Sequence, residues 1–222
     1  MNALTDPEAF ARNGATDFEA LVGAGGWRRL RGEIRRRFTD KPDADRDIRY
    51  RGVMEKVECS FFGWLLAQLC RLIGTPFALH RGRDVPTDIR LVDDGCGGVI
   101  WQREYHFAGR APARVQSTKR GGPEGSLLEC VGLGLGMRLA VFEANGDLHF
   151  LSLRYFCRIG GRYLSIPHLL SPGTAHVIHR DLGDGRFHFT MTIHHALFGT
   201  LFHQDGVFHD VVEDAQSIGA LR

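Results

Sequence analysis

The chain has 222 residues, of which 43% are hydrophobic and 24% are charged, and its formal net charge is +2. These values lie near the globular average, so they exclude a disordered chain, a collagen-like repeat and a coiled coil. The 28 glycines, against 8 prolines, favour many tight turns over a helical bundle. The length predicts one large domain, or one domain with an appendage.

The amino-terminal sequence, MNALTDPEAF, contains acids and no apolar stretch, so it indicates neither a signal peptide nor a transit peptide. The longest apolar run, residues 61–69, is much shorter than a membrane span. Five cysteines without a CxxC pair predict free thiols. We therefore expect a soluble, cytoplasmic protein without a membrane span.

Residues 27–38, WRRLRGEIRRRF, predict an amphipathic helix that follows a break at GAGG, residues 23–26. Its apolar stripe has spacings of three and four and consists of Trp27, Leu30, Ile34 and Phe38. The arginines would fill the opposite, solvent-exposed face. A local charge of +5 between Arg28 and Arg51 could attract an anionic surface. No aromatic residues interleave with the basic ones to stack on bases, so we expect no nucleic-acid binding.

Two regions are expected: an N-terminal helical appendage with a polar linker over residues 1–47, and a single β-rich domain over residues 48–222. The second region begins with a predicted strand, residues 48–58, and a predicted helix at about 61–73, FFGWLLAQLCRLIG. This helix is apolar on nearly all sides, which is typical of a buried helix. A lid over an apolar cavity, or an element at a membrane surface, remains the alternative.

After Pro86 the pattern changes to strands separated by glycine-rich turns. The predicted strands are 88–92, 99–107, 113–119, 127–133, 137–143, 148–159, 174–181, 187–195 and 200–208. The turn ANGD, around Asn145 and Gly146, is a strong hairpin signal because both residues tolerate positive φ. Residues 163–173, with two prolines, predict a loop-like excursion. The expected fold is mainly antiparallel β: a large curved sheet or partly closed barrel of about nine strands, covered or plugged by the helix.

Candidate site residues come first from the strand 99–107. Alternation places Trp101, Arg103, Tyr105 and Phe107 on one largely apolar face, where Arg103 would need a partner. Glu129 is an acid among apolar neighbours and could form that ion pair. The two residues could instead hold the polar end of a ligand, or Glu129 could be a general base.

Further candidates are Tyr155 and His168 for acid–base chemistry, and Phe189 and Gly134 for ligand contact. His168 lies in the proline-flanked excursion, where a side chain could face a ligand. Gly134 belongs to GLGLG, residues 132–136, where missing side chains could mark a bend or the approach of a ligand. No histidine or cysteine spacing predicts a metal site, although His194 with His203 and Asp205 is a conceivable group. We expect no metal and no cofactor.

Several pieces of the chain are similar to an uncharacterised bacterial family, domain of unknown function 4166. The matching pieces include GWRRLRGEIRRRF, IWQREYHF, LLECVGLGLGMRLAV, SIPHLLSPG and FHFTMTIHHALFGTLFHQDGVF. The resemblance covers nearly the whole chain and implies a single domain without an established activity. Fused members of that family imply a possible partnership with a nucleotide-dependent oxidoreductase.

The leading functional expectation is a binding domain for an apolar small molecule, lipid-like or polyketide-like, in a β-walled cavity. The alternative is a cofactor-independent cyclase or isomerase, in which Glu129, Arg103, Tyr155 or His168 moves or stabilises a proton. A third possibility is an interaction module beside an oxidoreductase. Ligand identity and oligomeric state do not follow from the sequence.

Overall fold

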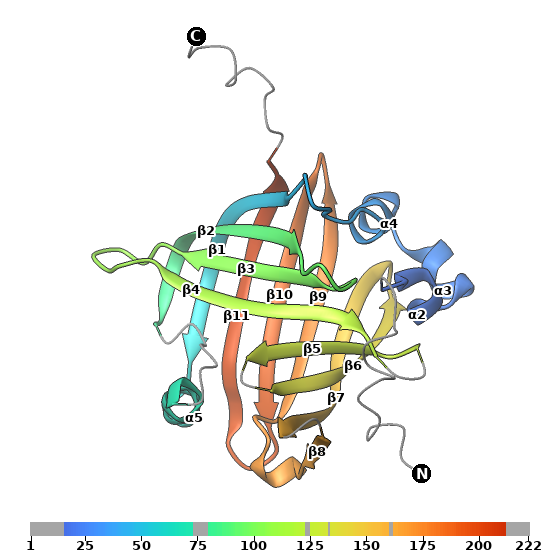
Figure 1. Ribbon diagram of the computed structural model, residues 1–222. Coiled ribbons are helices and arrows are strands. Elements are labelled where there is room, and N and C mark those ends of the chain that lie inside the picture. Colours follow the sequence, from blue (N-terminus) through green and yellow to red (C-terminus); the bar gives the residue numbers. More distant parts are fainter. Residues whose placement is uncertain (1–15, 73–79, 123–124, 133, 160–161, 212–222) are drawn as a thin grey trace.

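The computed structural model describes residues 16–72, 80–122, 125–132, 134–159 and 162–211. Within these ranges the chain folds into short helices and one large antiparallel sheet (Figure 1). The helices are α2 (Phe18–Val22), α3 (Ala24–Arg29), α4 (Gly32–Thr39), α5 (Phe61–Leu72) and the 3₁₀ helix η3 (His168–Leu170). The strands are β1 (Ile48–Cys59), β2 (Gly82–Asp93), β3 (Val99–Tyr105), β4 (Ala113–Gly121), β5 (Leu127–Gly132), β6 (Leu135–Ala144), β7 (Asp147–Ile159), β8 (Arg162–Ile166), β9 (Thr174–Gly183), β10 (Arg186–His195) and β11 (Gly199–Asp210).

The sheet closes into a ten-stranded barrel. Its strand order is β6-β5-β4-β3-β2-β1-β11-β10-β9-β7-β8, and β6 also pairs with β7. The long strand β7 pairs with β9 through Leu148–Leu151 and with β8 through Tyr155–Ile159, so β8 lies outside the ring. Mainly antiparallel β-structure is therefore confirmed, and the barrel is closed rather than partly closed. Closure satisfies the backbone groups that the outer strands of an open sheet would expose.

Local sequence explains most strands and their turns. Alternate residues of β1 are buried until Glu55, where a bulge shifts the register against β11. The predicted ANGD hairpin is confirmed, because Asn145 and Gly146 have φ of 56° and 81° and join β6 to β7. Strand β2 begins before Pro86 rather than after it, since Pro86 pairs with Val53 inside the sheet. Strand β8 occupies part of the segment that was expected to be a loop.

The predicted N-terminal helix is two helices, because Leu30 and Arg31 adopt ψ near 145° between α3 and α4. The predicted break at GAGG lies largely within α3. The apolar stripe is nevertheless buried, and it joins the same hydrophobic cluster as the barrel strands. The arginine face is not wholly solvated. The guanidinium carbon of Arg37 lies 4.1 Å from the centroid of the Phe187 ring, and this arginine is only 4% exposed.

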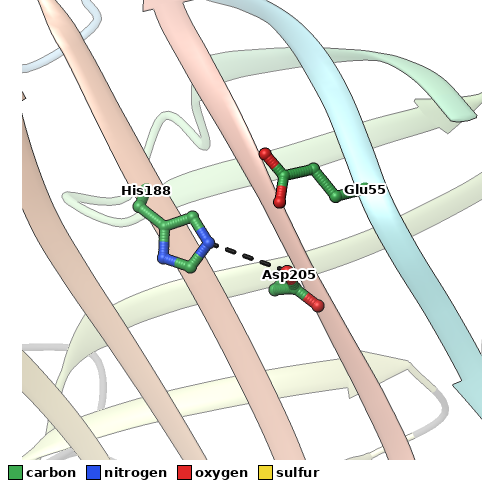
Figure 2. Close-up of side chains that lie close together, drawn as sticks. All are labelled: Glu55, His188 and Asp205. Atoms are coloured by element: carbon green, nitrogen blue, oxygen red, sulfur yellow. Dashed lines mark ion pairs between the residues drawn. The ribbon is translucent and has the colours of Figure 1, made fainter. Parts of the chain in front are cut away.

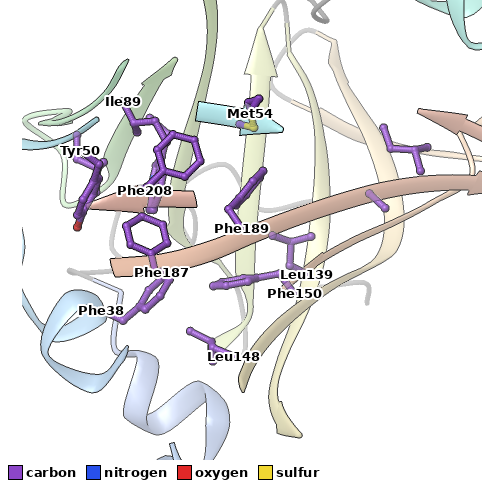
Figure 3. Packing of buried hydrophobic residues seen from close by; sticks show 14 of the residues in the cluster. Phe38, Tyr50, Met54, Ile89, Leu139, Leu148, Phe150, Phe187, Phe189 and Phe208 are labelled. Atoms are coloured by element: carbon purple, nitrogen blue, oxygen red, sulfur yellow. The ribbon is translucent and has the colours of Figure 1, made fainter. Parts of the chain in front are cut away.

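The hydrophobic core lies between α4 and the inner faces of the barrel strands (Figure 3). Phe38 from α4 contacts Phe150 of β7 at a ring-centroid distance of 5.6 Å, and Phe187 stacks on Phe208 at the same distance. Helix α5 packs against β11 elsewhere on the barrel, with Ala67 buried and Phe61 exposed. A helix over 61–72 is thus confirmed, whereas its role as a plug stays a prediction. None of the helices in the described ranges is both long and apolar enough to cross a bilayer.

Candidate functional site

The barrel encloses a cavity of about 340 Å³ whose lining is mostly apolar. Strand alternation builds this lining: Trp101 and Tyr105 project inward from β3, and Phe189 and Ile193 project inward from β10. Helices contribute at three places, with Phe38 from α4, Leu66 from α5 and Leu170 from η3. The volume is in the range of small-molecule sites in proteins.

A polar cluster interrupts the apolar wall where β3, β4 and β5 lie side by side. Glu129 accepts hydrogen bonds from Lys119 Nζ at 2.9 Å and from Ser117 Oγ at 2.7 Å. Arg103 donates to Ser117 Oγ at 3.4 Å. Lys119 Nζ also lies 4.9 Å from the centroid of the Trp101 ring. The four polar side chains therefore form one connected group at the cavity surface.

The charges of this cluster control its protonation. Burial by itself would raise the pKa of Glu129, but the positive charges of Lys119 and Arg103 and the two hydrogen bonds outweigh it and lower this pKa. Burial lowers the pKa of Lys119, with the charge of Glu129 opposing the shift. Glu129 is therefore an ionised, paired carboxylate at neutral pH, which makes it a weak general base.

Two further hydroxyl groups face the cavity. Tyr105 donates a hydrogen bond to Gln204 Oε1 at 3.0 Å, and both side chains are almost completely buried. Tyr155 lines the cavity near Glu129. Burial raises the pKa of Tyr155 to about 12, with the charge of Glu129 adding to the shift and a hydrogen bond with Ser152 opposing it. Both phenols stay protonated at neutral pH and can act as hydrogen-bond donors.

His179 lies on the cavity wall and is surrounded by aromatic rings. Its exposed fraction is 4%, and its ring centroid is 5.0 Å from that of Phe38 and 5.4 Å from that of Phe189. Burial lowers the pKa of His179 well below its ordinary value, and nearby cationic side chains act in the same direction. Its Nδ1 is buried without a hydrogen-bond partner in the part of the chain that the structure describes. A neutral imidazole with an unused polar atom thus borders the cavity.

The structure places six of the nine candidate residues on the cavity lining: Trp101, Arg103, Tyr105, Glu129, Tyr155 and Phe189. The other three lie elsewhere. Phe107 is buried but stacks on Tyr105 outside the lining, and His168 is exposed in η3. Gly134 has φ of +82°, and a side chain there would collide with the carbonyl oxygen of Arg158. Its missing side chain therefore accommodates a neighbouring backbone and not the cavity.

The ion pair of Glu129 is with Lys119, whereas the sequence paired it with Arg103. Strand register explains the correction, since Lys119 lies directly opposite Glu129, whereas Arg103 lies opposite Val115 on the intervening strand. Sequence reasoning also missed Gln204 and His179. Alternation carried a signal for both, because His179 shares a strand face with Val177, and Gln204 shares one with Phe202 and Phe208.

A second group of chemically active side chains lies on the outer barrel surface (Figure 2). Ligand atoms of Glu55, His188 and Asp205 all lie within 4.8 Å of one another. His203 Nε2 lies 3.1 Å from the same Asp205 carboxylate. The sequence grouped His194 with His203 and Asp205, but the fold brings His188 to this group instead, because β10 and β11 align it with Val207.

The comparisons with known proteins identify a family. Residues 30–208 match the model described as Domain of unknown function (DUF4166). The chain belongs to this family. The matched range of this DUF4166 chain contains α4 and every residue that lines the cavity. No curated protein matches the chain.

Proposed function

We propose that this DUF4166 domain binds an apolar small molecule that ends in an acidic group. The observation that supports the proposal is the cavity of about 340 Å³, in which an apolar lining meets a single charged cluster. Pockets of this kind take most of their affinity from apolar contact, and a few polar groups set the orientation of the ligand. A lipid-like or polyketide-like acid would place its apolar body against the lining and its acidic group at the charged cluster.

The sign of the charge in the cluster favours an acid over an amine. Arg103 and Lys119 contribute two positive charges, and Glu129 contributes one negative charge, so the cluster carries a net charge of +1. Glu129 already accepts hydrogen bonds from Lys119 and Ser117. Within the described residues Arg103 donates one hydrogen bond, at 3.4 Å to Ser117, and lies 5.7 Å from the Trp101 ring, so its guanidinium retains donors for a carboxylate. The ligand tail would then lie along Phe150 and Phe189.

Binding is better supported than acid–base catalysis. A general base works best with a pKa near the working pH, and the pKa of Glu129 is shifted downward by its cationic neighbours. A pKa of about 12 for Tyr155 also makes its hydroxyl a hydrogen-bond donor rather than a ready proton acceptor. A cyclase or isomerase activity would need another proton acceptor at the cavity, and the neutral imidazole of His179 on the lining is a candidate.

Isothermal titration of the full-length protein with dodecanoic acid, and separately with dodecylamine, tests the proposal. We expect saturable binding of the acid and at least about tenfold weaker binding of the amine. Arg103→Met should weaken the binding of dodecanoic acid at least about tenfold, because it removes the cation available to a carboxylate. Arg114→Met is the matched control, since Arg114 lies on β4 with a 79% exposed side chain and pairs with Glu104.

Native mass spectrometry of the purified protein complements the titration by detecting a co-purified apolar acid. Val177→Trp provides a steric test because Val177 lines the cavity and an indole would fill part of it. This variant should abolish binding while the circular dichroism spectrum is preserved. The proposal fails if neither the titration nor the mass spectrum detects a ligand, or if acid and amine bind equally.

A further inference from the structure

One end of the barrel exposes a continuous apolar patch. We call this patch the aromatic rim; it consists of Phe61, Phe62, Trp64 and Leu65 from α5 and Leu197 and Phe198 from the β10–β11 turn. Each of these side chains is at least 45% exposed. Phe62 stacks on Phe198 with ring centroids 4.5 Å apart, which joins the helix to the turn. Large contiguous apolar patches on a protein surface mark contact with a membrane or another molecule.

The segments that carry the aromatic rim, and the β7–β8 hairpin beside them, contain no acidic residue. The sequence has no Asp or Glu in residues 59–83, 148–180 or 185–204. Figure 1 shows the described parts of α5, the β7–β8 hairpin and the β10–β11 turn at one end of the barrel. Exposed arginines at this end include Arg81, Arg158 and Arg162, whereas the charge of the exposed Arg83 acts on Glu58 of β1. The segments that carry the aromatic rim therefore have basic and no acidic side chains, and Glu58 and Asp84 lie just outside them on β1 and β2.

The cavity reaches the same end. Leu170 of η3 lines the cavity although it is 74% exposed, and Leu66 of α5 lines it too. Gly173 lies so close to the backbone of His194 that a side chain at this position would collide with it. The ring of the neighbouring His195 stacks on Phe198 of the rim. The edge of the cavity and the aromatic rim are thus adjacent through these contacts.

We propose that the aromatic rim docks on the surface of a bilayer that contains anionic lipids. Aromatic and leucine side chains insert at the headgroup boundary, and arginines such as Arg158 and Arg162 are attracted to anionic headgroups. Docking would bring the cavity edge to the lipid surface, where an apolar acid could pass between bilayer and barrel. This last step rests on the proposed function, whereas docking itself does not.

Flotation of the full-length protein with vesicles tests the docking. We expect binding to vesicles of phosphatidylcholine with phosphatidylglycerol, and little binding to phosphatidylcholine alone. The double variant Phe61→Ser with Trp64→Ser should reduce the bound fraction at least about tenfold. Arg158→Gln with Arg162→Gln should reduce binding only to the anionic vesicles. Leu182→Ser is the control, because Leu182 is 41% exposed near the β9–β10 turn at the other end.

The docking proposal is overturned if the native chain does not float with anionic vesicles, or if the rim and control variants float equally. It also fails if analytical ultracentrifugation shows that the native chain is a dimer and that Phe61→Ser with Trp64→Ser converts it to a monomer. Titration with dodecanoic acid separates the two proposals. Retained acid binding without flotation removes docking alone, and flotation without acid binding removes the proposed function alone.

An independent observation concerns the outer group in Figure 2. Two imidazoles point their Nε2 atoms at one carboxylate: His188 lies 3.7 Å and His203 lies 3.1 Å from oxygens of Asp205. Each imidazole is held from behind by a threonine hydroxyl, with Thr190 3.4 Å from His188 Nδ1 and Thr192 2.9 Å from His203 Nδ1. Metal-binding histidines are commonly oriented through their second nitrogen in this way.

The bulge at Glu55 adds a second carboxylate to this group. Two carboxylates so close together repel each other unless a positive charge lies between them. We infer that Glu55, His188 and Asp205 bind one divalent transition-metal ion, for which mixed imidazole and carboxylate ligands are suitable, and that His203 positions Asp205. This assignment differs from the expectation of no metal, because the four residues come from strands that only the fold brings together.

Calorimetric titration with zinc chloride tests the metal site. We expect one equivalent to bind to the native chain, and both His188→Ala and Asp205→Asn to weaken that binding at least about tenfold. Thr192→Val should weaken it less, by loosening His203. His194→Ala is the matched control, because His194 lies exposed on the same strand as His188. Absence of zinc binding, or equal binding by control and site variants, overturns the assignment.

Discussion

At the scale of single residues, the charged cluster in the cavity wall should be highly sensitive to substitution. Lys119 and Glu129 are 9% and 8% exposed and lie 2.9 Å apart. Each compensates for the burial of the other, and removal of one leaves an isolated charge in an apolar setting. Ser117 also donates to Glu129, so the carboxylate has a second hydrogen-bond partner, and the ammonium of Lys119 has a second contact in the Trp101 ring.

We expect Lys119→Met to lower the free energy of unfolding by about 3–5 kcal/mol, because it leaves Glu129 buried without its ion-pair partner. Adding Glu129→Leu to this variant should recover much of the loss, since the cluster then holds no unpaired carboxylate. Urea unfolding of the native chain, the two single variants and the double variant measures both effects. Simple additivity of the single effects would contradict the ion pair as described.

His179 predicts a pH dependence of stability. Its pKa in the folded protein lies well below the value of about 6.5 in an unfolded chain, so the unfolded state binds the proton first as the pH falls. Stability linked to His179 is therefore present above about pH 6.5 and declines below it, by up to about 1.4 kcal/mol per pH unit. Below about pH 6.5, the free energy of unfolding should depend less steeply on pH in His179→Phe than in the native chain. The exposed His194→Gln should keep the native slope, and an unchanged slope in His179→Phe would refute the prediction.

At the scale of elements, the contact between α5 and the barrel depends on Gly63. A side chain at this position would collide with the carbonyl oxygen of Leu201 on β11. The close approach seats the helix against the sheet, with Ala67 buried and Leu66 at the cavity. Its remaining face stays free to form the aromatic rim. Helix α5 thus packs against the barrel with one face and exposes the aromatic rim with the other.

Gly63→Ala should destabilise the protein by about 1–3 kcal/mol, because the added methyl group must push α5 away from β11. Gly32→Ala is the matched substitution in α4, where an added Cβ would meet nothing within 4 Å. We expect it to be neutral or to stabilise by about 0.4–1 kcal/mol. Thermal and urea unfolding distinguish these outcomes, and equal effects of both substitutions would argue against tight seating of α5.

At the scale of the whole molecule, the N-terminal helices and the barrel share one hydrophobic core. Phe38 connects them, since it contacts Phe150 and His179 and also lines the cavity. Removing its ring would open a void at the helical side of the cavity. The stability of the barrel and the size of the binding space are therefore coupled through α4.

Phe38→Ala should cost about 3–5 kcal/mol of stability, the usual effect of deleting a buried ring. Phe61→Ala, which truncates a 67% exposed side chain, should change stability by no more than about 0.5 kcal/mol. Urea unfolding provides the comparison. A small effect of Phe38→Ala would mean that α4 contributes little to the core.

Sequence patterns over short distances predicted much of the fold. Alternation located the barrel strands, the Asn145–Gly146 turn predicted a hairpin, and the apolar stripe from Trp27 to Phe38 predicted which helical side chains are buried. These features depend on consecutive residues, so their signal is local. The break at Leu30 and Arg31 escaped prediction because the stripe keeps the same spacing on both sides of it.

By itself, the sequence determined an antiparallel β-rich chain with a helix at α5 and an inward face that carries Arg103 and Tyr105. Only the tertiary structure decided that β6 pairs with β7 to close the barrel, that Lys119 is the partner of Glu129, and that His188 joins His203 and Asp205. The tertiary structure also showed why Gly134 and Gly63 are glycines: at each position another segment's backbone comes too close for a side chain. The physical reason is that side-chain periodicity is encoded locally, whereas strand register and cavity walls arise from contacts between distant segments.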